Sequence, residues 1–353
     1  MVNLQELLAS ALTNGASDVH IIVGHPPLFR IHTVLQPAAG HTAVTAEEAE
    51  QFVRQMVGEK RFSDLLERRD IDFSIEAGAL GRFRVNAHFQ RGSIAIAFRA
   101  ILDRVPAIAE LNLPPVIEQF IDLPRGLVLV TGQTGSGKST TLASMIDAMN
   151  QRFRYHVITV EDPVEYELRS NMCIIEQREL GADVPTFASG LKHALRQDPN
   201  VLLVGEMRDL ETTSAAITAA ETGHLVLSTM HTQSAAQTIE RIIDIYPAEQ
   251  QTQIRSQLST TLQAVISMVL FKRADIPGMI PACEVMICNA AVRTCIRENR
   301  IHEIPNIIAT NRRIGMTTLD DAIKALYLNG NITREQALAH AVRQDSLKQA
   351  LSA

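Results

Sequence analysis

The sequence predicts an α/β fold preceded by a smaller α+β domain, and the rhythm of its apolar residues carries this prediction. Beyond residue 113, short β-branched runs (GLVLVTG, HVITVE, VLLVGE and HLVLST) alternate with helical stretches at 139–151, 186–197, 210–222 and 234–243. This alternation is typical of a buried, largely parallel sheet. Before residue 102, alternating runs bounded by glycine and proline are typical of an antiparallel sheet. A chain of 353 residues has room for about two such domains.

The N-terminal domain is expected over residues 1–101. Residues 3–14 place Leu and Ala at i, i+3, i+4 spacing, which predicts a helix that ends at Gly15. Strands are expected at DVHIIV, LFRIHTVL, DIDFSIE, RFRVNAHFQ and SIAIAFRAI, with a helix near 46–57.

A linker is expected over 102–113, where proline begins to interrupt any long periodic element. The second domain should then span 114–353. Its last part, from about 248, is expected to be mainly helical, with one strand pair at SMVLFKR and MIPACEVMI.

Charge and composition exclude several classes of protein. The net charge is −6 and no long basic block occurs, which argues against a nucleic-acid surface. Four cysteines without a C-x-x-C pair indicate free thiols in a reducing compartment. The first ten residues lack the basic start of a secretory signal, and no run approaches 18 apolar residues, so we expect a cytoplasmic protein with no transmembrane segment.

A phosphate-binding loop is predicted directly after the strand GLVLVT. The motif G-x-x-x-x-G-K-[ST] is matched by Gly132, Gln133, Thr134, Gly135, Ser136, Gly137, Lys138 and Ser139. Glycines let backbone N–H groups turn onto phosphates, and the following helix adds its positive end. Lys138 is expected to reach the β/γ-phosphates of a nucleotide and Ser139 to ligate Mg²⁺.

Two further strands end in carboxylates, which would project at the same edge of a parallel sheet. Glu206 follows VLLVG and is expected to be the base that activates water; the alternative is an acid that caps the next helix. Glu161 ends HVITVE and is the best candidate acid there.

Two histidines bracket the strand HLVLSTM. Seven residues apart on an extended run, His224 and His231 lie too far from each other to share a metal. His231, at the carboxyl end, is expected to sense the γ-phosphate. For His224 a structural and a functional role are equally open.

Together, GQTGSGKST, TVEDPVEYEL, ALRQDPNVLLVGEMRD and TGHLVLSTMHTQSA resemble the Walker A, Asp box, Walker B and His box of the type II/IV secretion ATPase superfamily, and within it the PilT-type retraction motors of type IV pili. The resemblance extends to SDVHI, RFRVNAHFQRG and AVRTCIRE, so it covers nearly the whole chain. It implies an N-terminal PAS-like domain joined to a RecA-like P-loop ATPase domain, assembled as a homohexameric ring.

The resemblance also implies roles for particular residues. The ATP-contacting loop corresponds to Gly132 through Thr140, the Asp-box acid to Glu161, the Walker B catalytic acid to Glu206, the His-box histidines to His224 and His231, and the nucleotide-directed arginines of the first domain to Arg82 and Arg84. The implied ligands are ATP and Mg²⁺. The implied partners are further copies of the chain and an inner-membrane platform protein at the pilus base, where the chain would lie peripherally.

Three departures from the family pattern bear on function. Gln133 stands where proline is frequent, on the outer arc of the loop. Thr294 and Cys295 alter the usual AIRNLIRE pattern, which leaves open an accessory, PilU-type retraction ATPase that works beside a paralogue. The extension motor is disfavoured, because the chain is short and lacks that family's four-cysteine motif.

Two further alternatives come from other classes. One is a nucleotide-binding regulatory or scaffold protein with negligible turnover, and the other is a nucleic-acid translocase, which the acidic charge disfavours. A last expectation concerns 290–300, a short helix whose stripe of Arg293, Arg297 and Arg300 is either a solvated face or a docking surface.

Overall fold

The computed structural model describes residues 3–31, 34–101 and 104–351. The chain divides into two compact units, Met1–Arg104 with Pro163–Glu167, and Val105–Asp162 with Leu168–Ala353. The expected linker at 102–113 begins on two residues, 102 and 103, that lie outside the described residues. Each unit is built around its own sheet.

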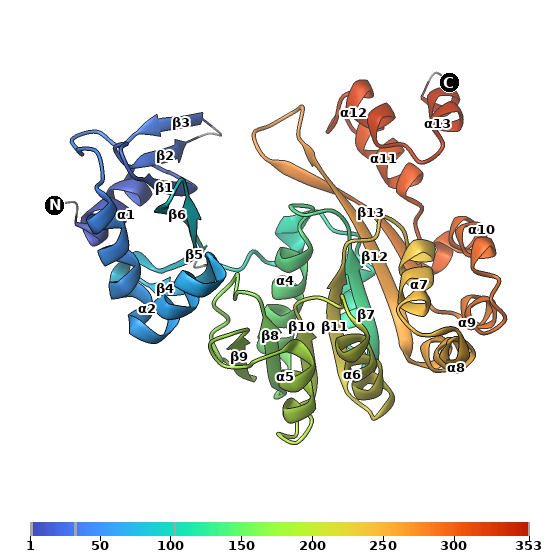
Figure 1. The fold of residues 1–353 in the computed structure, drawn as a ribbon. Helices are drawn as coiled ribbons and strands as arrows, with labels where there is room; N and C mark the ends of the chain where they lie inside the picture. The colour runs from blue at the N-terminus through green and yellow to red at the C-terminus, as the bar shows by residue number, and fades with distance from the viewer. Residues whose placement is uncertain (1–2, 32–33, 102–103, 352–353) are drawn as a thin grey trace. The chain divides into compact units, whose positions relative to one another are not determined.

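The N-terminal unit is a six-stranded antiparallel sheet in the order β3-β2-β1-β6-β5-β4, packed with two helices (Figure 1). Its elements are α1 (Leu4–Thr13), β1 (Asp18–Ile22), β2 (Leu28–Ile31), β3 (Val34–Pro37), α2 (Ala46–Arg68), β4 (Asp70–Glu76), β5 (Arg82–Gln90) and β6 (Ser93–Ala100). Phe62, Phe73 and Phe83 are at most 1% exposed and anchor the core. The α+β prediction for this part is confirmed.

Two elements of this unit differ from expectation. LFRIHTVL is a hairpin of β2 and β3, whose connecting residues 32 and 33 lie outside the described residues. Helix α2 begins with a capping box between Thr45 and Glu48 and continues to Arg68, beyond the expected end at 57. At Gly58 the backbone has φ 71°, so the helix kinks there and resumes.

The second unit holds a seven-stranded sheet in the order β13-β12-β7-β11-β10-β8-β9, parallel except for the edge strand β13. Its strands are β7 (Gly126–Thr131), β8 (His156–Glu161), β9 (Ile174–Glu179), β10 (Val201–Val204), β11 (Leu225–Met230), β12 (Leu262–Lys272) and β13 (Met279–Ile287). The central strands β7, β10 and β11 are buried at every residue, because helices cover both faces. The predicted α/β class is confirmed.

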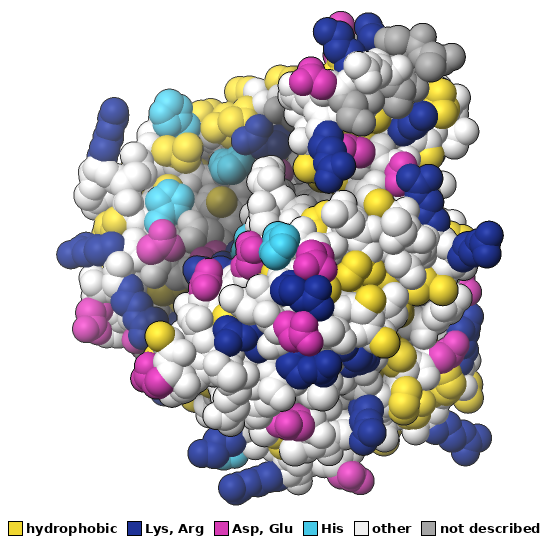
Figure 2. Space-filling view, turned by 90° about the vertical axis from the view of Figure 1, so that its right-hand side faces the viewer, with side chains coloured by type: hydrophobic (Ala, Val, Ile, Leu, Met, Phe, Trp, Pro, Cys, Tyr) yellow, Lys and Arg dark blue, Asp and Glu magenta, His cyan; other side chains and the backbone are white. Residues whose placement is uncertain are grey.

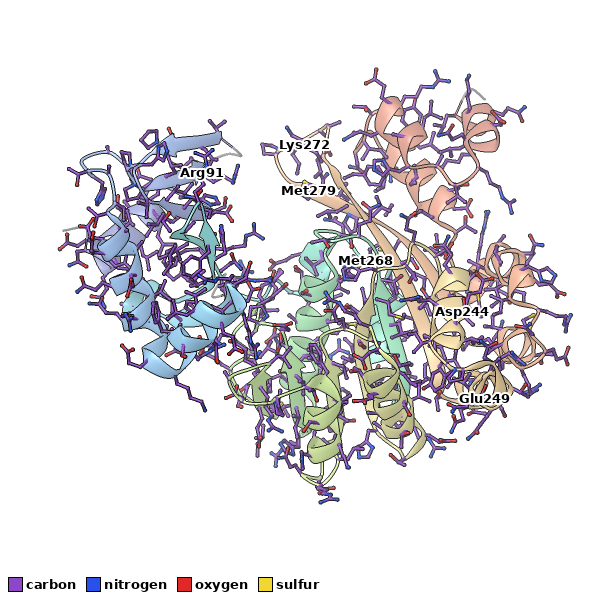
Figure 3. The ribbon with its side chains drawn as sticks, in the orientation of Figure 1. Arg91, Asp244, Glu249, Met268, Lys272 and Met279 are labelled. Atoms are coloured by element: carbon purple, nitrogen blue, oxygen red, sulfur yellow. The ribbon has the colours of Figure 1, made fainter. Side chains whose placement is uncertain are left out.

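Helices flank this sheet and form the end of the chain (Figure 1). They are α3 (Ile117–Ile121), α4 (Lys138–Arg152), α5 (Phe187–Ala194), α6 (Leu210–Glu221), α7 (Ala235–Asp244), α8 (Gln251–Thr261), α9 (Ala290–Arg297), α10 (Ile304–Thr310), α11 (Leu319–Leu328), α12 (Arg334–Ala339) and α13 (Gln344–Ala350). The last three pack on the β12–β13 hairpin through a cluster that includes Phe271, Ile280 and Ile323. Lys272 and Met279 mark the free end of this hairpin (Figure 3).

Strand β9 and the early start of β12 are absent from the sequence-based expectation. Strand β9 has the sequence IIEQRE and lies at the sheet edge beside β8, so it lacks the apolar run that marks a buried strand. Strand β12 begins at Leu262, directly after α8 ends at Thr261. With no glycine or proline between them, the sequence carries no signal for that boundary.

Helix α9 confirms a helix at the start of 290–300, but it ends at Arg297, so Arg300 lies beyond it and pairs with Glu298 and Glu303. The expected arginine stripe is corrected further at Arg293. Val292, Cys295 and Ile296 are buried on one face, as predicted. The guanidinium of Arg293, however, donates hydrogen bonds to the carbonyl oxygens of Ser259 (2.7 Å) and Thr260 (2.9 Å). These belong to the last turn of α8, whose carbonyls have no partner within the helix. Arg293 is therefore an internal cap for α8 and not part of a free outward stripe.

Within the described residues, no helix has both the length and the apolar character needed to span a membrane. On the face drawn in Figure 2, Lys and Arg side chains lie among Asp and Glu side chains, without one block of a single sign.

Candidate active site

The predicted phosphate loop lies between β7 and α4, at the carboxyl edge of the second sheet. Its first glycine, Gly132, has φ 140°, and a Cβ there would lie 2.4 Å from the Met268 carbonyl oxygen and 2.6 Å from Ser136 Oγ. Met268 lies on β12 beside the loop (Figure 3). Any larger residue at 132 would force the loop away from β12.

Lys138 and Ser136 present polar atoms inside this loop. Lys138 is 8% exposed, and its Nζ donates to the carbonyl oxygens of Gly132 and Gln133, both at 2.9 Å. The hydroxyl of Ser136 is buried without a hydrogen-bond partner. A buried donor without an acceptor, beside an amine and a helix N-terminus, fits an anionic phosphate group. Ser139 and Thr140 lie half-buried in the first turn of α4.

Glu206 lies just beyond the end of β10, two strands from β7 in the sheet. Its side chain is 13% exposed, and its Oε2 lies 2.5 Å from Arg208 Nε and 3.3 Å from His231 Nε2. The alternative of a helix-capping acid is wrong for Glu206, because Asp209 caps α6 by accepting from the Thr212 N–H. Glu206 therefore does not cap α6.

Glu161 ends β8, the neighbour of β10. Its Oε1 accepts hydrogen bonds from Thr159 Oγ1 (2.6 Å) and Gln177 Nε2 (3.1 Å). Because β7, β8, β10 and β11 are parallel, the phosphate loop, Glu161, Glu206 and His231 all lie at one edge of the sheet.

His224 lies at the opposite end of the parallel strands, where their amino ends meet. It precedes β11, and its Nδ1 is 3.0 Å from the carbonyl oxygen of Ala219 and 3.3 Å from Thr222 Oγ1, at the end of α6. The length of β11 separates it from His231, roughly 20 Å for an extended run. Within one chain, the structure does not bring the two histidines together, and a site role for His224 stays a prediction.

Arg82 and Arg84 belong to the N-terminal unit. Both side chains are half-buried on one face of β5, while Phe83 between them points into the core, as the alternation predicts. An Nη2 of Arg82 lies 2.5 Å from Ser74 Oγ on the neighbouring strand β4.

Several residues that shape the site were not singled out from the sequence. Gln177 lies on β9, a strand that was missed. Ser267 accepts from Thr131 Oγ1 at 2.8 Å, across 136 residues of chain, and no local pattern marks it. Arg208 is two residues from Glu206, and its charge in GEMRD was a signal that could have been used.

Comparisons with known proteins place this site in a family. The family model described as "Type II/IV secretion system protein" matches residues 2–352. The chain is 44% identical to the type IV pilus retraction ATPase PilT of Pseudomonas aeruginosa, covering 95% of this chain and 97% of that protein. It is 36% identical to the type IV pilus ATPase PilU of the same organism, covering 98% of this chain and 91% of PilU.

A solved structure is similar over the whole length. The crystal structure of the pilus retraction motor PilT with bound ADP matches with a TM-score of 0.92 and 40% identity, covering 99% of this chain and 100% of that one. Matches of this extent in both sequence and fold leave one assignment: the chain belongs to the type II/IV secretion system protein family and is similar throughout to its PilT members.

Proposed function

We propose that this chain is an ATP-hydrolysing motor that powers the retraction of type IV pili. One observation carries the proposal: the phosphate loop packed against β12 and the Glu206–His231 pair lie at the same end of the parallel strands. The extent of similarity to PilT, in sequence and in fold, supports the mechanical output.

The loop from Gly132 to Thr140 holds the phosphates of ATP. Backbone N–H groups and the Ser136 hydroxyl donate to phosphate oxygens, and Lys138 supplies the positive charge at the β/γ-phosphates. Ser139, half-buried in the first turn of α4, would supply the protein oxygen that ligates Mg²⁺ when MgATP is bound. That ion would neutralise part of the phosphate charge.

Glu206 accepts a proton from the attacking water. Its carboxylate lies beside Arg208 and His231, which orient it. Glu161, oriented by Thr159 and Gln177, is the second acid of the site, at the end of the neighbouring strand β8. His231 follows β11 and reports the state of the γ-phosphate to the loop that leads into α7.

Assembly completes the site. The chain forms a homohexamer in which Arg82 and Arg84 supply positive charge to a bound nucleotide. His224 acts at a site other than the one at the carboxyl ends of its own strands. The motor lies at the cytoplasmic side of the inner membrane, at the pilus base, and acts on a platform protein there. These assignments rest on the family resemblance.

The test begins with steady-state phosphate release by the purified chain. Turnover that is abolished by Glu206→Gln supports the motor, whereas negligible turnover by the wild-type ring favours a nucleotide-binding regulatory or scaffold protein. ATPase activity that rises with added DNA or RNA would indicate a translocase.

In the host, deletion of the gene should leave surface pili in excess and abolish surface motility. Loss of motility with normal pilus numbers would instead indicate the accessory, PilU-type role, since a paralogous retraction ATPase would then still shorten the pili.

A further inference from the structure

The edge strand β13 carries a carboxylate, Glu284, in register with the ends of the strands that bear the site. Glu284 pairs with Ser267 on β12, Ser267 with Thr131 on β7, and Thr131 with Met230 on β11. The row therefore joins Glu284 to the residue before the phosphate loop and to the residue before His231. Residues in register on neighbouring strands place their side chains on the same face.

The carboxylate holds the far end of the loop that carries His231. Residues 231–234 connect β11 to α7, and Glu284 Oε1 accepts a hydrogen bond of 2.8 Å from the backbone N–H of Ala235, the first residue of α7. Apart from the His231–Glu206 contact, which spans 25 residues, hydrogen bonds of this loop join Thr232 to Thr238 and Gln233 to Gln237, within the same segment. The bond to Glu284 instead spans 49 residues of chain.

The setting of Glu284 is costly for a carboxylate. Burial raises its pKa above the usual value and the Asp320 carboxylate raises it further, whereas the backbone N–H groups of Ala235 and Leu319 lower it. Leu319 begins α11, which packs on β13. One half-buried acid thus faces the first residues of two helices, α7 behind the site loop and α11 at the start of the C-terminal helices.

We propose that Glu284 is a positioning residue that sets His231 against Glu206 by holding the start of α7 as a hydrogen-bond acceptor. Helix α7 runs beside β12 and β13 and ends at Asp244 (Figure 3). With its first residue fixed to β13, the four-residue loop has both ends anchored, one by β11 and one by Glu284. A shift of about 1 Å in a positioned catalytic group costs on the order of 100-fold in rate. This inference rests on the proposed role of His231 in hydrolysis.

The experiment compares Glu284→Met with Glu284→Gln. Both keep the length of the side chain, but only Gln retains an oxygen that can accept from Ala235. We expect Met to lower kcat by about 10- to 100-fold with the KM for MgATP within twofold, because the phosphate loop is untouched, and Gln to recover most of kcat. Glu240→Gln, on the exposed side of α7, is the matched control.

A double-mutant cycle with His231→Ala tests the route. If Glu284 acts through His231, Glu284→Met lowers kcat no further in the His231→Ala background. An unchanged kcat in Glu284→Met, or the full loss repeated in that background, overturns the inference while leaving the ATPase proposal intact. A wild-type kcat in His231→Ala alone overturns the role of His231 and this inference with it.

A second variant removes the same hydrogen bond from the donor side, so that the test does not depend on the folding of Glu284→Met. Ala235→Pro replaces the N–H at the first position of α7, where proline is tolerated, by ring carbons at a buried site, and Ser234 has the extended φ −147° and ψ 161° that suit a residue before proline. It should reproduce the kcat loss of Glu284→Met, and a wild-type kcat would overturn the inference.

Discussion

The imidazole Nε2 of His231 lies 3.3 Å from the Oε2 of Glu206, so the ends of two neighbouring parallel strands, β11 and β10, bring a histidine and an acid into hydrogen-bond range. The residues are 25 positions apart in the chain. The pairing of β10 with β11 brings the two side chains together, so their distance depends on the register between these strands.

Glu206→Gln should separate binding from hydrolysis. The amide keeps the shape of the side chain but cannot take a proton, a loss of typically 10²- to 10⁴-fold in rate. A fluorescent ATP analogue should bind Glu206→Gln with near wild-type affinity, whereas Lys138→Ala should bind it weakly because the cation at the β/γ-phosphates is gone. Glu211→Gln, exposed on α6, is the control. Hydrolysis by the Gln variant at the wild-type rate would remove Glu206 from the catalytic role.

Gly132→Ala should destabilise the chain through a backbone clash. Its Cβ would lie 2.4 Å from the Met268 carbonyl oxygen, and φ 140° is itself unfavourable for alanine. Strain and overpacking together cost roughly 2–5 kcal/mol in free energy of unfolding. Gly223→Ala has φ 113° with nothing within 4 Å of the new Cβ and is the matched control, expected to lose roughly 1–2 kcal/mol. Equal losses in thermal melts of the two variants would show that the contact with Met268 is unimportant.

ATPase activity should depend on assembly. Arg82 and Arg84 belong to a different compact unit from the phosphate loop, and a cation supplied by a neighbouring subunit contributes roughly 10³- to 10⁵-fold to rate where it has been measured. Specific activity should therefore fall on dilution below the concentration at which the ring forms. A monomer fraction from size exclusion that hydrolyses ATP as fast as the ring would contradict this prediction.

Arg293→Ala and Arg297→Ala should differ in stability although they lie one helical turn apart. The first removes three hydrogen bonds, two to the end of α8 and one of 3.1 Å to Gln263 Oε1, and should lose about 1–3 kcal/mol. Arg297 is exposed, and its loss should stay within about 0.5 kcal/mol. Urea unfolding of the two variants measures the difference, and equal midpoints would return Arg293 to the solvated face expected from the sequence.

The buried cysteines should resist alkylation in the native protein. Burial raises the pKa of both Cys283 and Cys288 to about 12, so almost no thiolate is present at pH 8. Iodoacetamide followed by mass spectrometry should leave both unmodified in the native chain and modify all four cysteines after unfolding in guanidinium. Rapid native labelling of Cys283 would show that the β12–β13 hairpin opens readily.

The parts of the site that could be predicted are those written locally in the sequence. The phosphate loop has fixed spacing, and Glu206 and Glu161 each follow an apolar run that ends at a strand boundary, so their common edge follows from parallel pairing. The fold class came from the same runs. Strand β9 was missed because an edge strand with the sequence IIEQRE shows no apolar run.

Other features depend on contacts that no local pattern encodes. Arg293 and Arg297 lie on one stripe of α9, yet only Arg293 caps α8, because α8 packs beside it. The same holds for Ser267, Met268 and Glu284, which meet the site through β12 and β13; Ser267 is 136 residues after Thr131. Helical spacing predicts which residues share a face, but not what packs against that face.

The contact between Gly132 and Met268 also bears on the order of events during synthesis. Strand β7 leaves the ribosome early, but its neighbour β12 follows 136 residues later, as the Thr131–Ser267 bond shows. At about 5–20 residues per second this is a delay of roughly 7 to 27 s. Until then the phosphate loop lacks its contact with β12, and one side of the apolar strand β7 stays unpaired in the nascent chain. The ability to capture a nucleotide is therefore acquired late, once β12 at 262–272 of the 353 residues has been made, so fragments that end before β12 should remain clients of chaperones.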